Sequence, residues 1–163
     1  MENRTRRRVI AALGSVLGGS ALRWKRDAET DTFGAWLVGA NELPTVETDA
    51  FGVALFRVAP DERAIDYWLV VADVENVEES HVHKGPPDLN GNVVAYLFGP
   101  ARDPVTTTGL LACGRLTDED VIWPLTDAAE MIEQMREENV YVNVHTTEHP
   151  SGEIRGQIRL LGG

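Results

Sequence analysis

The stretch YVNVHTTEHPSGEIRGQIR, residues 141–159, predicts an antiparallel β-hairpin. On both sides of a central turn, apolar and polar residues alternate as they do in half-buried strands. The turn contains Pro150, which fixes the backbone angle φ, and Gly152, which can adopt a positive φ. Gly156, inside the second strand, predicts a bulge or the close approach of another backbone.

Strand parity assigns the polar side chains of this hairpin to one face. Successive side chains of a strand point to opposite faces, so the valines at 140, 142 and 144 share one face. This apolar face must be the buried one, which leaves Tyr141, Asn143 and His145 on the other face. In the run SHVH, the central valine points to the core while His81 and His83 point away from it together. We therefore expect all three strand histidines on outward faces.

The rest of the chain consists of short apolar or alternating runs separated by turn-rich pieces. The predicted strands are residues 33–39, 50–58, 64–74, 80–83, 92–98, 109–116, 139–146 and 153–160. This pattern predicts an all-β fold, an antiparallel Greek-key β-sandwich of about eight strands.

One helix is predicted before the last hairpin, in TDAAEMIEQMREEN, residues 126–139. Thr126 or Asp127 can cap its amino end. Ala129, Ile132 and Met135 recur at helical spacing and are expected to face the core.

The single cysteine, Cys113, has no partner for an intramolecular disulfide. Because it lies in the apolar run GLLACG, we expect it to be a small buried hydrophobic residue. A chain of 163 residues corresponds to one domain.

Charge is distributed unevenly along the chain. Residues 1–26 contain seven basic residues and one acid, whereas residues 27–163 contain 25 acids and eight basic residues. Such an acidic body repels nucleic acid and anionic lipid, so no nucleic-acid partner is expected. Two lysines accompany thirteen arginines. This composition resembles proteins adapted to high salt, and an ordinary acidic secreted protein is the alternative.

The amino-terminal stretch TRRRVIAALGSVLGGSAL, residues 5–22, predicts an export signal. Its fourteen uncharged residues from Val9 to Leu22 are too few to span a hydrocarbon core of about 30 Å as a helix. Arg6 and Arg7 stand in a pattern that resembles the twin-arginine signature, and Gly19 and Ala21 offer an imperfect cleavage site. An uncleaved basic tail on a cytoplasmic protein is the alternative.

We therefore assign residues 1–30 to an export signal and linker and residues 31–163 to one β-sandwich domain. The mature protein is expected to be secreted or at the cell surface, without a stable membrane span after signal removal.

Three blocks of the sequence resemble the chordin-type (CHRD) domain. They are FGAWLVGANELPTVETDAFGVA at 33–54, HVHKGPPDLNGNVVAYLF at 81–98 and the hairpin stretch at 141–159. The resemblance runs from about Phe33 to Leu160, with one departure in KGPPDLNG, where a proline and an aspartate replace smaller residues. It implies an extracytoplasmic all-β domain and no settled biochemical activity.

The residues that carry this resemblance also have local structural explanations. Glu42 and Pro44 start a bend between the first two strands, and Arg155 can form a charge-assisted hydrogen bond with Glu153, Glu148 or Asn143 that fixes the hairpin. We interpret the set as one that specifies the fold: Glu42, Pro44, Asn143, Glu153, Arg155 and Gly156.

The histidines point to metal chemistry. Two histidines at positions i and i+2 of a strand can reach one metal ion, and a third from a neighbouring strand completes a facial set. We predict a site for copper or zinc at His81, His83 and His145, with His149 or Asp88 nearby. A polar hydrogen-bond cluster and a ligand-recognition surface are the competing interpretations.

The HVH strand also resembles the copper-ligand strand of copper/zinc superoxide dismutase, and the predicted sandwich resembles that enzyme's fold. The loop after His83 contains no histidine, so the bridging ligand and zinc cluster of that enzyme are missing. This difference argues against dismutation.

No motif for hydrolytic or nucleotide chemistry occurs in the sequence. Two functions remain open. The first, which we favour, is a non-enzymatic binding or structural module outside the membrane, with an unidentified extracellular protein or surface ligand as its partner. The second is a small metal-dependent redox protein that uses the three histidines.

Overall fold

The structure, a computed structural model, describes residues 30–162. Within this range the chain forms eight β-strands, a short 3-10 helix and one α-helix. The strands are β1 (Thr32–Val38), β2 (Phe51–Val58), β3 (Ala64–Lys84), β4 (Asn92–Phe98), β5 (Val105–Thr117), β6 (Val140–Thr146), β7 (Ile154–Gln157) and β8 (Arg159–Leu160). The helices are η1 (Gly39–Asn41) and α2 (Ala128–Arg136). The export-signal prediction concerns residues outside the described range.

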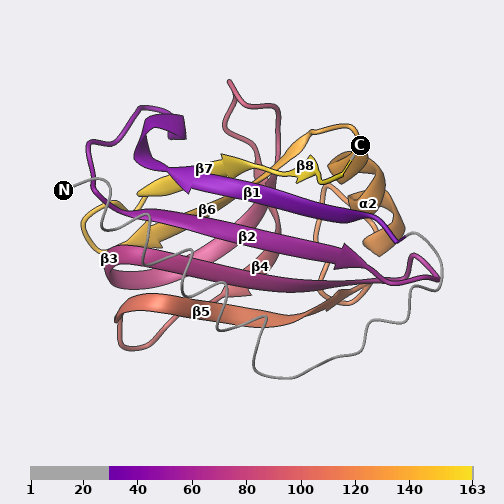
Figure 1. The fold of residues 1–163 in the computed structure, drawn as a ribbon, viewed down its shortest axis with the longest axis horizontal. Coiled ribbons are helices and arrows are strands. Elements are labelled where there is room, and N and C mark those ends of the chain that lie inside the picture. Colours follow the sequence, from indigo (N-terminus) through magenta and orange to yellow (C-terminus); the bar gives the residue numbers. More distant parts are fainter. Residues whose placement is uncertain (1–29, 163) are drawn as a thin grey trace.

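All strand pairs in this part of the chain are antiparallel, which confirms the all-β prediction with about eight strands and one short helix (Figure 1). The finer prediction of a two-sheet sandwich differs from the structure. The pairing runs β2-β1-β7-β6-β3, and β3 returns to β2, so these five strands close into a barrel. The remaining strands extend this one sheet, since β4 and β5 pair with β3 and β8 pairs with β1.

The long strand β3 explains why two predicted strands became one. Residues 65–72 pair with β2, whereas residues 77–84 pair with β6. Between these two halves the register with β5 shifts, and Asp73 and Asn76 adopt positive φ angles. Such irregularities bend a strand without ending it. β3 therefore runs without a break from its pairing with β2 to its pairing with β6. Its second half carries His81 and His83.

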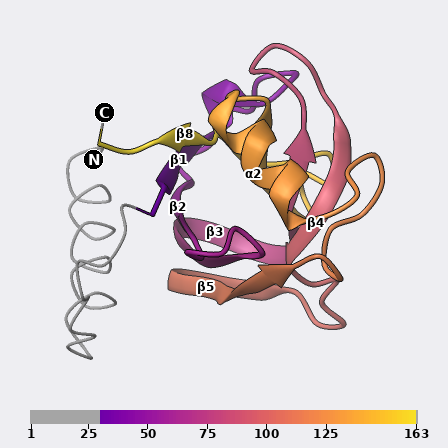
Figure 2. The ribbon, with the colours of Figure 1, turned by 90° about the vertical axis from the view of Figure 1, so that its right-hand side faces the viewer.

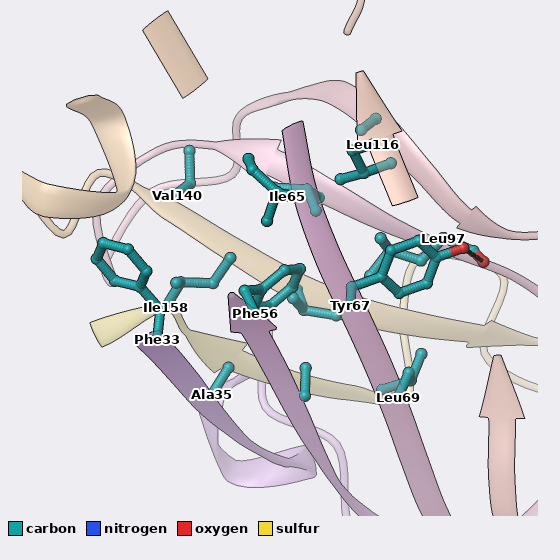
Figure 3. Close-up of a cluster of buried hydrophobic side chains, with 14 of the residues drawn as sticks. Phe33, Ala35, Phe56, Ile65, Tyr67, Leu69, Leu97, Leu116, Val140 and Ile158 are labelled. Atoms are coloured by element: carbon teal, nitrogen blue, oxygen red, sulfur yellow. Dashed lines mark hydrogen bonds between the residues drawn. The ribbon is translucent and has the colours of Figure 1, made fainter. Parts of the chain in front are cut away.

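The apolar core fills the inside of the barrel (Figure 3). The valine face of β6 belongs to it as predicted, since the side chains at 140, 142 and 144 are fully buried. Phe33 of β1, Phe56 of β2 and Ile65 of β3 point into the same cluster. The Tyr67 hydroxyl donates a hydrogen bond to the Leu97 carbonyl at 2.8 Å, which satisfies a polar group at the edge of the cluster.

Helix α2 lies across one end of the barrel (Figure 2). The predicted cap is confirmed, because the Asp127 carboxylate accepts a hydrogen bond from the Glu130 backbone N–H at 2.8 Å. The predicted inner face is partly wrong: Ala129 is exposed, and Ala128 takes its place. The buried face consists of Ala128, Met131, Ile132 and Met135.

The prediction for Cys113 is wrong, because its side chain is exposed. Cys113 lies on β5, which pairs with β3 along one edge, opposite Trp68. Much of β5 is exposed on both faces, so an apolar run in the sequence does not correspond to a buried strand here.

No helix in residues 30–162 is long and apolar enough to cross a membrane.

Candidate metal centre

The pairing of β3 with β6 brings the three strand histidines together. His81 is paired with Asn143, and His145 is paired with Glu79, so His81 and His145 are diagonal neighbours on the same face. One ring nitrogen from each of His81, His83 and His145 lies within 4.8 Å of the others. The structure thus assembles the predicted set from residues 64 positions apart in the chain.

These histidines are on the face opposite the valines, but the prediction that this face is outward is wrong. Their exposed fractions are 4% for His81, 8% for His83 and 7% for His145. Other segments cover them: His81 contacts the Tyr96 ring of β4, and His83 stacks on Tyr141 at 4.9 Å between ring centroids. Strand parity identifies the face of a side chain, but it does not say which loops fold over that face.

Backbone carbonyls fix the orientation of two of the rings. Nδ1 of His83 lies 2.9 Å from the Gly91 carbonyl, and Nδ1 of His145 lies 2.9 Å from the Pro150 carbonyl. A carbonyl can only accept, so in each neutral ring the proton is on Nδ1 and Nε2 carries a lone pair. Nε2 of His83 is buried without a hydrogen-bond partner in the protein.

His81 lies between His145 and Glu79. Its Nδ1 atom is 3.1 Å from Nε2 of His145. Its Nε2 atom is 3.3 Å from a carboxylate oxygen of Glu79, although the contact is too poorly aligned to be a hydrogen bond. Burial, with smaller contributions from His145 and His83, lowers the pKa of His81 to about 3. His81 is therefore neutral at pH 7, and its contact with Glu79 is not an ion pair there.

Burial also lowers the pKa of His83, partly opposed by its hydrogen bond to Gly91. Both rings are thus neutral imidazoles, the form that binds metal ions. His149 and Asp88, which the sequence placed near the site, do not belong to the ligand set that the described residues form.

The sequence is similar to that of a known domain family. The model of the CHRD domain family matches residues 33–158. The chain belongs to the CHRD domain family. It is also 27% identical over 132 residues to chordin from Danio rerio. The aligned part covers 80% of this chain but 13% of that chordin, so the chain spans a small part of its relative's length. No solved structure matches.

Arg155 of this CHRD domain is fully buried, but its partners differ from the predicted ones. Its guanidinium donates to Asn90 Oδ1 at 2.8 Å and to the carbonyls of Pro86 and Leu89 at 3.0 Å, and it stacks over the Tyr141 ring at 3.5 Å. Arg155 therefore holds the loop between β3 and β4 over the site instead of bonding within the hairpin. This loop also carries Gly91, the partner of His83.

Other signature residues hold the hairpin itself. The Glu153 carboxylate accepts hydrogen bonds from the hydroxyls of Thr48 at 2.7 Å and Thr146 at 2.9 Å, which ties the β1–β2 connection to the end of β6. Gly156 confirms the predicted close approach, because a Cβ there would collide with the Trp36 carbonyl of β1. Pro44 lies in the same β1–β2 connection.

Glu42 has an unusual environment. Burial raises the pKa of its carboxyl to about 7, although the nearby Arg155 charge opposes this shift. Its Oε1 atom is buried without a hydrogen-bond partner. The same atom would collide with a Cβ on Gly152, whose φ of 122° already favours glycine. Glu42 therefore packs directly against the turn that positions His145.

Sequence reasoning placed Asn143 in the fold signature and missed its position within the cluster. Its Oδ1 atom lies 3.0 Å from Nε2 of His145. The shared strand face was a signal that could have revealed this position.

Arg155 also lines a separate groove of about 720 Å³ on the β1 and β2 side, together with Trp36, Val53 and Leu161.

Proposed function

We propose that this CHRD domain is a metal-binding module in which His81, His83 and His145 hold one Zn(II) or Cu(II) ion. The observation that carries the proposal is the convergence of nitrogen lone pairs in a buried site. Imidazole nitrogen suits both ions. A three-histidine set leaves a fourth coordination position, which either a protein atom or an exchangeable ligand can take.

Counting the ring protons distinguishes this proposal from a plain hydrogen-bond cluster. Two of the three protons are directed at the Gly91 and Pro150 carbonyls. If the third is on Nδ1 of His81, the lone pair of Nε2 faces the Glu79 carboxylate at 3.3 Å. If it is on Nε2, two lone pairs face each other at 3.1 Å.

Either arrangement leaves acceptors opposite acceptors in a buried site, which costs free energy. A second proton on His81 would remove the conflict, but the lowered pKa of His81 keeps this ring neutral near pH 7. A metal cation satisfies all three lone pairs at once. The carbonyls of Gly91 and Pro150 and the Glu79 carboxylate then act as the outer hydrogen-bond partners typical of metal-bound histidines.

The test is a Zn(II) titration at pH 7 of untagged protein stripped with a chelator. We expect one ion per chain, with release near pH 5 because protons compete for the nitrogens. His83→Ala should weaken binding by at least about 100-fold, which corresponds to about 2.7 kcal/mol. The matched control is His149→Ala, since His149 is outside the cluster. Equal affinity in both variants and the wild type would contradict the proposal.

We further infer that the domain works outside the membrane. The twin-arginine-like pattern at Arg6 and Arg7 and the extracytoplasmic setting implied by the family resemblance support this inference. A reporter fused behind residues 1–30 should leave the cytoplasm, and a double lysine substitution at Arg6 and Arg7 should stop it. Unchanged export of the substituted reporter would remove the twin-arginine assignment.

The excess of acidic residues after the amino-terminal stretch supports the inference that the protein works in a saline environment. Residues 27–163 carry 25 acids and eight basic residues, and their mutual repulsion is screened within about 3 Å in 1 M salt. We expect the melting temperature to rise from low to molar sodium chloride. A flat dependence would contradict adaptation to salt without affecting the metal proposal.

A further inference from the structure

Strand register places Asn143 in the middle of the histidine cluster. Its Cα is paired with that of His81 across β3 and β6, and His145 follows two residues later on the same face. Its side chain is 3% exposed, and Oδ1 lies 3.0 Å from Nε2 of His145. Since the Pro150 carbonyl takes the ring proton of His145, these two atoms are both acceptors.

The surroundings of the amide explain why its oxygen faces the histidines. A Cβ on Gly152 would lie 3.0 Å from Asn143 Nδ2 and would collide with Glu42 Oε1, so both atoms border the same spot. Nδ2 can only donate, so it suits a position near this carboxyl oxygen, which has no hydrogen-bond partner. The oxygen is therefore left directed at a group of nitrogen lone pairs, which a cation would satisfy.

The distances are close to those between neighbouring ligands of one ion. Bonds of about 2.0–2.2 Å from zinc to nitrogen or oxygen place adjacent ligand atoms of a tetrahedral site roughly 3.3–3.6 Å apart. The contact between His81 and His145 is 3.1 Å, and the contact between Asn143 and His145 is 3.0 Å, so each pair needs to move apart by only a few tenths of an ångström. The widest nitrogen separation, 4.8 Å, exceeds this range, so the ligand side chains must draw closer as the ion binds.

We propose that Asn143 Oδ1 is the fourth ligand, which closes the site as three nitrogens and one oxygen. This inference rests on the proposed function and specifies what kind of site it is. Closed four-coordinate zinc sites are structural, whereas catalytic sites keep a position for water. The ion then clamps β3 to β6 and offers no position to a substrate.

The test uses Co(II) as a spectroscopic substitute for Zn(II) and azide as a competing ligand. The visible spectrum of the Co(II) protein should not change on adding azide. Asn143→Ala should open the site, make the spectrum respond to azide and weaken Zn(II) binding by at least about tenfold. Asn143→Asp keeps an oxygen at the same position and should restore the azide-insensitive spectrum. Asn92→Ala, an exposed asparagine on β4, is the matched control.

The outcomes separate this inference from the proposal on which it rests. A wild-type Co(II) protein that binds azide overturns the fourth ligand and leaves the three-histidine site standing. An Asn143→Ala protein with unchanged affinity and no azide response overturns it as well. A wild-type protein that binds neither Zn(II) nor Co(II) overturns both. If Asn143→Ala does not fold, the wild type and Asn143→Asp still decide the question.

Discussion

Strand β6 buries all seven of its residues, but its two faces are buried against different neighbours. The valines at 140, 142 and 144 pack into the apolar core. On the opposite face, Tyr141, Asn143 and His145 lie beside the histidines of β3 and beneath polar loops. An apolar side chain is satisfied by contact alone, whereas each buried polar atom needs a specific partner.

This difference shows where buried polar side-chain atoms lack hydrogen-bond partners. The valine side chains have no polar atoms that need such a partner. On the polar face, one atom each of Glu42, His81 and His83 is buried without a hydrogen-bond partner. All three residues lie on the polar side of β6, so this side is where a ligand would gain the most. Three substitutions test this contrast.

The largest expected effect comes from His81 in the metal-free protein. Its folded-state pKa is about 3, below the ordinary histidine value of 6.5, so the unfolded chain binds more protons between these values. Stability should therefore fall as the pH drops from about 6.5 to 3, by up to roughly 4–5 kcal/mol. His81→Gln should remove most of this slope in chemical denaturation curves recorded with chelator. An unchanged slope would show that His81 is not buried in neutral form.

Glu42 should make the stability of the folded protein depend on pH in the opposite direction. Its folded-state pKa of about 7 exceeds the ordinary glutamate value of 4.5, so the folded protein holds the extra proton between these values. Stability should fall as the pH rises from 4.5 to 7, by up to about 3 kcal/mol. Glu42→Gln should be more stable than the wild type at pH 8 and similar to it at pH 4. Equal stability of the two at pH 8 would contradict a buried carboxylate.

The smallest effect on this scale is Val142→Ala on the apolar face. Val142 is fully buried in the core, so losing two methyl groups should cost about 2 kcal/mol. Because no titrating group is involved, the loss should be the same from pH 5 to pH 8. The variant should still bind one Zn(II) per chain. A loss of metal binding here would mean that the two faces are not independent.

Local patterns in the sequence were enough to predict the hairpin, the strand faces and the cap of α2. Alternation identifies the valine face, and Asp127 caps α2 through a contact three residues away. Closure of the barrel was not predictable in this way. It depends on β3 continuing through Asp73 and Asn76, which have positive φ angles, and across residues 75–79, where the sequence predicted a gap between two strands.

The candidate site was only partly predictable for the same reason. The three histidines share a face that parity can assign, but their burial depends on Tyr96, Gly91 and Pro150, which other segments supply. Arg155 likewise finds its partners 65 or more residues away. Contacts over such separations are set by the fold as a whole and leave no periodic signal in the sequence.

Anomalous diffraction at the zinc absorption edge, on crystals of the untagged domain grown with Zn(II) at pH 7, tests the central claim most directly. The account predicts one strong peak per chain, about 2.0–2.1 Å from Nδ1 of His81 and from Nε2 of His83 and His145. The peak should be missing from His83→Ala crystals. A map with no peak at these three nitrogens, or with peaks only at surface carboxylates or His149, would contradict it.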